Sequence, residues 1–197
     1  MKFFLYLFSV GVLLGSLSCR MVSVDERTAP VNSNSLVVYQ IKAGQHFSQQ
    51  DALRFTSKTT LTFEATFNES AMYQSREPGN QGDINKLYGF SDCNTHHQTN
   101  SARFGWNWTG NALRIYAYCY QNSKVIAQEI GTVNLNETNT YQLAIVGSKY
   151  VFRLRNKTVE IPRGCSETAT QQRYRLYPYF GGDEPAPHDV TISIKEL

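Results

Sequence analysis

The 197-residue sequence contains no hydrophobic segment long enough to span a bilayer, no cluster of basic or acidic residues, and only four cysteines. Its formal net charge is +3, and the Lys and Arg residues are scattered along the chain. Such a small, dispersed charge argues against a nucleic-acid partner. No stretch of ten or more residues carries a convincing helical period. The length therefore predicts a single domain that is large enough to bury a core.

The N-terminus is typical of a secreted protein. In residues 1–18, Lys2 precedes a short apolar stretch, as in a signal peptide. The residues before Cys19 resemble a bacterial lipobox, in which the cysteine becomes acylated, although Ser16 stands where Leu is usual. They also fit ordinary signal peptidase. Lipidation at Cys19 is favoured, residues 19–35 are expected to form a flexible tether, and residues 36–197 the folded domain. A secreted protein of the cell envelope is predicted, with membrane contact only through the lipid.

The folded part shows the periodicity of strands. Residues 59–67 alternate apolar and polar side chains, as expected of a half-buried strand. Residues 86–90 and 102–108 are two aromatic strands separated by a polar loop, and residues 112–120 form a third strand after a tight turn. Counted along the chain, about eleven short strands predict an all-β fold, an antiparallel β-sandwich of jelly-roll type.

The strand at residues 112–120 carries a stripe of tyrosines. Strict alternation places Leu113, Ile115, Ala117 and Cys119 on the core side and Arg114, Tyr116, Tyr118 and Tyr120 on the other. Two interpretations remain open. The tyrosines either pack across strands as structural residues, or they form a platform for a carbohydrate, whose apolar face a flat ring covers while polar neighbours bind its hydroxyls.

Cysteine pairing depends on Cys19. If Cys19 carries lipid, three cysteines remain, and an oxidising compartment favours one disulfide and one free thiol. The pair Cys93 and Cys119 is favoured because it would tie the polar loop to a neighbouring strand. The pair Cys93 and Cys165 is the alternative, and three reduced cysteines with Cys119 in the core is a further one.

At this level the chain resembles the concanavalin A-like jelly rolls, the sandwich shared by many lectins, carbohydrate-binding modules, glucanases and polysaccharide lyases. The strand pattern carries the likeness, together with the aromatic strands at residues 86–90 and 102–108 and the ending Tyr-Phe-Gly-Gly-Asp at 179–183. The resemblance implies a carbohydrate ligand. The chain also resembles a group of bacterial surface lipoproteins, which implies no activity.

Motifs of the enzymes in that superfamily are missing. The sequence contains no Glu-x-Asp-x-Glu strand, which retaining glucanases need to bring an acid and a nucleophile to one cleft. The Gln-x-His strand of alginate-lyase-like members is missing too. These absences favour a non-catalytic protein.

Two groups of residues are metal candidates. His96 and His97 lie near Cys93, but no fourth ligand stands at a diagnostic spacing. Asp183, Glu184 and Asp189 offer carboxylates for a structural calcium ion, although an ordinary acidic loop is the favoured interpretation. No cofactor is therefore expected, with Ca²⁺ as the alternative.

The favoured function is a surface domain that binds a glycan or a surface protein. Alternatives are a polysaccharide lyase or glycoside hydrolase, and a structural envelope lipoprotein with protein partners. The predicted ligand-facing residues are Tyr88, Asp92, His96, His97, Arg103, Trp106, Trp108, Tyr116 and Tyr118.

Overall fold

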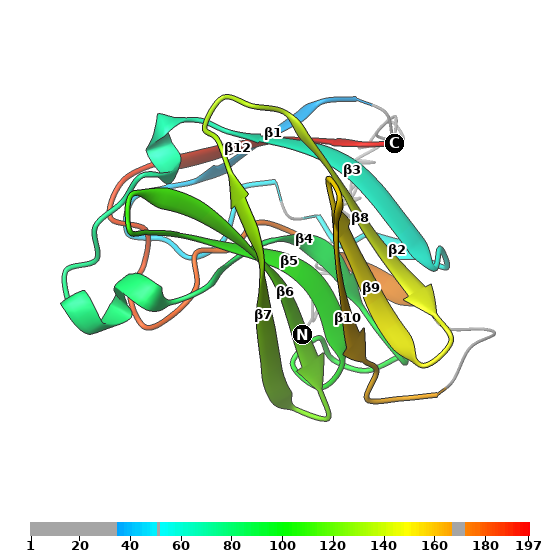
Figure 1. Cartoon of the computed structure of the whole chain (residues 1–197). Helices are drawn as coiled ribbons and strands as arrows, with labels where there is room; N and C mark the ends of the chain where they lie inside the picture. The colour runs from blue at the N-terminus through cyan, green and yellow to red at the C-terminus, as the bar shows by residue number, and fades with distance from the viewer. Residues whose placement is uncertain (1–34, 51, 167–171) are drawn as a thin grey trace, which may run out of the picture. The chain divides into compact units, whose positions relative to one another are not determined.

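A computed structural model describes residues 35–50, 52–166 and 172–197 of the chain (Figure 1). The predicted signal peptide, the lipidation site at Cys19 and nearly all of the predicted tether lie outside these residues. Within the described part, no helix has the length and apolar character needed to cross a membrane.

The described residues fold as two six-stranded antiparallel sheets packed face to face (Figure 1). The first, here called the β3 sheet, has the order β1 (Val37–Ile41), β12 (Val190–Glu196), β3 (Thr60–Phe67), β8 (Asn139–Val146), β9 (Lys149–Leu154) and β10 (Lys157–Pro162). The second, the β5 sheet, has the order β2 (Phe55–Thr56), β11 (Arg173–Leu176), β4 (Asn85–Ser91), β5 (Ser101–Thr109), β6 (Ala112–Gln121) and β7 (Lys124–Val133). Two short 3₁₀ helices, η1 (Glu69–Ala71) and η2 (Pro78–Gly82), lie between β3 and β4. The predicted all-β sandwich is confirmed.

The core lies between the sheets and is rich in aromatic rings. Phe63 of β3 stacks on Tyr141 of β8, with ring centroids 5.1 Å apart, and meets Phe104 of β5 edge to face at 5.8 Å. Such pairs add stability beyond the area that they bury. Alternation along β6 follows the prediction, with Leu113 and Ile115 in this core.

The opposite side of the β5 sheet, here called the outer face, carries the remaining side chains of β5 and β6. The β5–β6 turn is tight because Gly110 and Asn111 adopt positive φ values of 59° and 56°, as a two-residue hairpin requires. Arg103 therefore lies directly opposite Tyr118. Because paired residues share a face, both side chains lie on the outer face.

The structure corrects the predicted ligand set at three aromatic residues. Trp106 is fully buried in the core, and Trp108 packs against the core. Both lie on the side of β5 opposite to Arg103, because side chains alternate along a strand. Tyr88 is also buried, and its hydroxyl donates to Glu196 at 2.6 Å. A β-bulge between Lys86 and Gly89 breaks the alternation of β4, so that Tyr88 points inward like its neighbour Leu87.

The favoured disulfide is corrected as well. Cys93 is joined to Cys165, with Cα atoms 6.3 Å apart, and Cys119 is a free thiol. Cys119 is fully buried on the core side of β6, which turns it away from the loop that carries Cys93. Burial raises the pKa of the Cys119 thiol, so it remains protonated and inert.

Candidate functional site

Arg103 is the most unusual residue of the outer face. Only 7% of its surface is exposed, and its Nε finds no hydrogen-bond partner. Among the described residues, no carboxylate forms an ion pair with its guanidinium group. Burial lowers the pKa of Arg103 from its ordinary value, while the field of surrounding tyrosine side chains acts the other way. A desolvated cation without an anionic partner is costly for the folded protein, so Arg103 is a candidate for binding an anion.

Tyrosines surround this guanidinium group. The Tyr118 ring lies 5.8 Å from the guanidinium carbon, within the range of a cation–π contact. The tyrosines that interact electrostatically with Arg103 come from three segments of the chain: Tyr118, Tyr120, Tyr174 and Tyr179. Gly89, opposite Arg103 on the other side, has no room for a side chain, since a Cβ there would lie 2.4 Å from that of Arg103. Arg103 thus places a buried positive charge between tyrosine rings.

Lys86 of β4 adds a second cation. Its Nζ lies 4.7 Å from the centre of the Tyr118 ring. Burial, and then the positive charge of Arg103, lower the pKa of Lys86 to about 8, while Asp83 raises it by a smaller amount. An amine with this pKa changes its charge close to neutral pH. The outer face therefore holds one permanent cation and one that titrates.

His97 lies within electrostatic range of Arg103 and is hydrogen-bonded to Tyr174 of β11. The Tyr174 oxygen accepts from the His97 backbone N–H at 2.8 Å and lies 3.0 Å from Nδ1. Because burial, Arg103 and His96 lower the pKa of His97 to about 4, its ring is neutral at pH 7. We assign the tyrosine hydroxyl as donor to Nδ1, which leaves the hydrogen of the ring on Nε2.

The loop between β4 and β5 borders a shallow depression. His96 is exposed at its rim, with the ring centroid 4.2 Å from that of His97. The residues that line the depression come from this loop, β2, β11 and the residue before β11: Phe55, Asn94, Thr95, His96, Gln172 and Tyr174. The depression thus adjoins the His97–Tyr174 pair.

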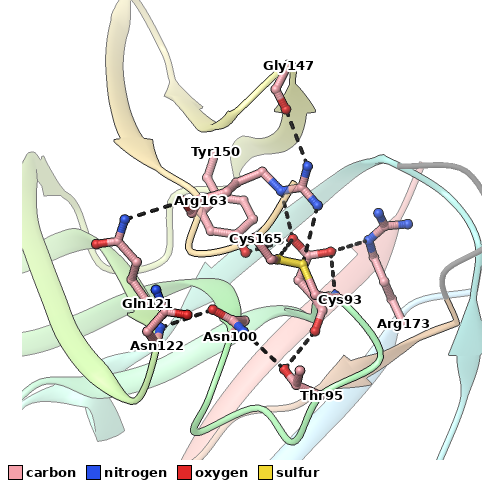
Figure 2. Close-up of a disulfide and its surroundings, with 11 residues drawn as sticks. Cys93, Thr95, Asn100, Gln121, Asn122, Gly147, Tyr150, Arg163, Cys165 and Arg173 are labelled. Carbon is pink, nitrogen blue, oxygen red and sulfur yellow. Dashed lines mark hydrogen bonds and ion pairs between the residues drawn. A yellow bond between two sulfur atoms is a disulfide. The ribbon is translucent and has the colours of Figure 1, made fainter. Parts of the chain in front are cut away.

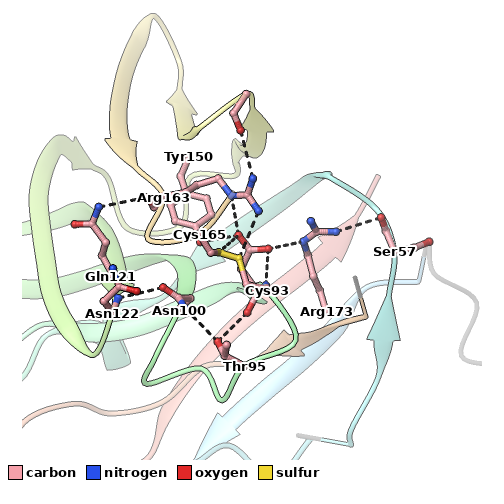
Figure 3. Close-up of polar contacts among 12 residues, drawn as sticks. Ser57, Cys93, Thr95, Asn100, Gln121, Asn122, Tyr150, Arg163, Cys165 and Arg173 are labelled. Atoms are coloured by element: carbon pink, nitrogen blue, oxygen red, sulfur yellow. Dashed lines mark hydrogen bonds and ion pairs between the residues drawn. A yellow bond between two sulfur atoms is a disulfide. The ribbon is translucent and has the colours of Figure 1, made fainter. Parts of the chain in front are cut away.

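Asp92 anchors this loop from the interior. The fully buried carboxylate accepts from Arg163 Nε at 2.9 Å, Arg173 Nε at 3.1 Å and the Tyr150 hydroxyl at 2.7 Å. Arg173 also donates a hydrogen bond from Nη1 to the carbonyl oxygen of Ser57, at 3.4 Å (Figure 3). The prediction that Asp92 faces a ligand is therefore corrected: it is a buried structural anion, neutralised by two cations.

The disulfide lies against this anchor and fixes the same loop (Figure 2). Arg163 Nη2 lies 3.7 Å from Cys93 Sγ, so the bridge and the ion pairs form one cluster at the end of the sandwich. The Asn100 side chain accepts from the backbone N–H of Asn122, which ties the loop to the β6–β7 turn. Ser101 Oγ donates to the His97 carbonyl at 2.6 Å. His97 is positioned by these contacts.

The outcome for the predicted site is mixed. Tyr116 and Tyr118 lie with Arg103 on the outer face, and His97 and His96 stand at one end of it. Three further residues of this surface were missed by the sequence analysis: Lys86, Tyr174 and Tyr179. Lys86 lies before the bulge and alternates with core residues of β4, so the alternation of this strand could have placed it on the outer face. The two tyrosines join from a distant part of the chain, and no local pattern indicates that.

The carboxylates proposed for calcium serve separate contacts. Glu184 accepts from the backbone N–H groups of Arg76 and Glu77 at 2.8 and 2.9 Å, while Asp189 pairs with Lys42 at 2.8 Å. In the described part of the chain, the single group with metal-ligand spacing is Asp92, Cys93 and Cys165, whose two cysteines form the disulfide.

Comparisons with known proteins identify the fold. No protein-family model matches the chain, and no curated protein matches its sequence. Among solved structures, alginate lyase AlyC3 superposes with a TM-score of 0.57 at 10% identity over 84% of this chain and 75% of its own. The GH16 protein of the Bacteroides ovatus mixed linkage glucan PUL gives 0.54 at 9% identity over 83% and 81%. Alginate lyase vAL-1 from Chlorella virus gives 0.52 at 11% identity over 82% of each chain. At these identities the likeness shows the jelly-roll fold alone.

Proposed function

We propose that the outer face of the β5 sheet binds an acidic polysaccharide, with Arg103 as the residue that receives a carboxylate or sulfate group. The observation that carries the proposal is the buried, unpaired guanidinium group of Arg103 among tyrosine rings. An incoming anion would supply the missing partner through a charge-assisted hydrogen bond. The rings would meanwhile cover the apolar faces of sugar units.

Charge and chemistry around Arg103 favour an acidic glycan over a neutral one. Lys86 places a second positive charge beside it, and the neutral His97 supplies a hydrogen-bond donor for a hydroxyl group. The jelly-roll proteins that superpose on this chain include two alginate lyases, which supports a polyuronate as a first ligand to test.

The test is calorimetric titration of the protein with alginate, polygalacturonate and a neutral mixed-linkage glucan. We expect binding of an acidic polymer, a loss of at least tenfold in affinity for Arg103→Gln, and weaker binding at high salt. Arg114→Gln is the matched control. Arg114 is more exposed and already paired with Glu129 at 3.1 Å, so its loss should change the affinity less than twofold.

Failure of every acidic glycan to bind would overturn this proposal and favour a structural role with protein partners. Equal effects of the Arg103 and Arg114 variants would contradict the role assigned to Arg103.

A second candidate function is cleavage of the bound uronate chain by β-elimination, which the pKa of about 8 at Lys86 favours. Neutral Lys86 would remove the hydrogen on the carbon next to the carboxyl group. Arg103 would neutralise the negative charge of that carboxyl group. The electron pair of that C–H bond forms a C=C bond while the bond to the glycosidic oxygen breaks. Tyr118, kept protonated because burial raises its pKa, lies beside Lys86 and would donate a proton to that oxygen.

Ultraviolet absorbance of unsaturated uronate ends tests the second candidate. A lyase generates such ends from alginate or polygalacturonate, at a rate that rises as the pH passes about 8, and Lys86→Gln abolishes the reaction. Binding without any new absorbance would leave a non-catalytic binding protein.

We further propose that the protein acts outside the cytoplasm, anchored through a lipid on Cys19. The Cys93–Cys165 disulfide supports an oxidising compartment. Mass spectrometry of the mature N-terminus tests this, since an unmodified terminus or one other than Cys19 would refute the anchor.

A further inference from the structure

A row of paired residues crosses the outer face beside Arg103. Lys86 pairs with Gly105 of β5, which pairs with Tyr116 of β6. In the other direction, Lys86 pairs with Tyr179, and Tyr179 pairs with Phe47. Residues that are directly paired place their side chains on one face, so Phe47 and Tyr179 continue the surface that holds the two cations.

The two rings are exposed. Phe47 keeps 54% of its surface in contact with solvent and Tyr179 keeps 38%, while Ser48 and Phe180, the next residues in each segment, are buried. Single exposed apolar residues are common on proteins. Two exposed aromatic residues that are paired with each other beside a buried cation are less common, and Tyr179 also interacts electrostatically with Arg103.

Hydrogen bonds hold this part of the surface rigid. Tyr179 exchanges both backbone hydrogen bonds with Lys86, at 2.8 and 3.0 Å. His46 stacks on the Tyr179 ring with centroids 5.4 Å apart, and its Nδ1–H donates to the Phe180 carbonyl oxygen at 2.8 Å. A ring that is fixed before the ligand arrives loses little conformational entropy on binding.

We infer that Phe47 and Tyr179 form a stacking subsite for a sugar unit that flanks the unit whose acidic group reaches Arg103. This inference rests on the proposed function. The row from Phe47 to Tyr116 crosses four strand spacings of about 4.8 Å, about 19 Å in all. The glycan therefore crosses the strands, and its binding depends on chain length.

The test compares short and long ligands on the same variants. Wild type, Phe47→Ala and Tyr179→Ala are titrated with a uronate disaccharide and with long uronate oligosaccharides from the polymer that binds best. We expect each variant to lose about tenfold in affinity for the long ligand, and we expect Phe47→Ala to bind the disaccharide as the wild type does. Tyr179→Phe, which keeps the ring, should retain the long-ligand affinity. Val146→Ala, which alters an exposed apolar residue of the β3 sheet, is the surface control.

The outcomes separate this inference from the proposed function. If both alanine variants bind long ligands like the wild type while Arg103→Gln does not, the subsite is overturned and the acidic-glycan function stands. Equal losses for short and long ligands would also overturn the subsite, since the rings would then act on the acidic unit itself. Failure of the wild type to bind any uronate overturns both.

Discussion

Arg103 carries a charge at a position where the free protein gains little from it. Its guanidinium group is nearly inaccessible, and its Nε lacks a partner. A residue chosen for stability at this position would be apolar or paired. The proposed binding role therefore gives a reason for Arg103 that packing does not, because binding sites often break the rules that the rest of a protein follows.

We predict that Arg103→Met stabilises the unliganded protein. The apolar side chain keeps most of the volume and removes the desolvated charge, so the free energy of unfolding should rise by about 1 kcal/mol. Chemical denaturation measures it, and glycan affinity should fall in the same variant. A clearly less stable Arg103→Met would mean that Arg103 is a structural residue held by the tyrosine rings.

Lys86 predicts a pH dependence with a definite sign. Because burial lowers its pKa to about 8, folded Lys86 is charged below that pH and neutral above it, whereas in the unfolded chain it stays protonated to about 10.5. Affinity for a polyanion should therefore fall as the pH rises through about 8, and protein stability should rise between about 8 and 10.5. Calorimetry across this range measures the first effect. A Lys86→Gln variant that retains the same pH dependence would contradict the assignment.

At the scale of elements, the sequence predicted how β6 divides its side chains but not how β4 and β5 do. Alternation correctly separated Tyr116 and Tyr118 from the core side of β6, whereas on β5 Arg103 was grouped with Trp106 and Trp108, which lie on the core side. The bulge in β4 turned Tyr88 inward because one extra residue shifts the side that every following side chain faces. Tyr174 and Tyr179 join the site through long-range strand pairing, for which a single sequence contains no local signal.

We predict that the disulfide stabilises the fold and holds the loop between β4 and β5 in its position. Cys165→Ser removes the link to Cys93, 72 residues away, and should lower the free energy of unfolding by about 3 kcal/mol. Glycan affinity should also fall, because the loop holds His97 next to Arg103. Denaturation and calorimetry measure both, with Cys119→Ala as the control for a change at the free thiol.

Alkylation tests which two cysteines are paired. When the protein is unfolded without reductant, an alkylating label should react with Cys119 and not with Cys93 or Cys165. Label at Cys165 instead would restore the pairing of Cys93 with Cys119.

For the whole molecule, we predict that calcium is not needed for folding. The carboxylates of Glu184 and Asp189 are engaged with backbone N–H groups and Lys42. These contacts lower the pKa of each carboxyl group, so both remain ionised and paired near neutral pH. Differential scanning calorimetry with and without EDTA should therefore give the same melting temperature. A drop that added calcium reverses would assign the loop a structural metal.

A crystal structure of the protein with a uronate oligosaccharide would test the proposed site most directly. We expect a carboxylate group within hydrogen-bond distance of the Arg103 guanidinium group, with sugar units lying across β4, β5 and β6 on the outer face. An oligosaccharide bound to the β3 sheet instead, for example in the depression near Gln142 and Arg153, would contradict this expectation. Arg103 would then be a buried cation without a functional explanation.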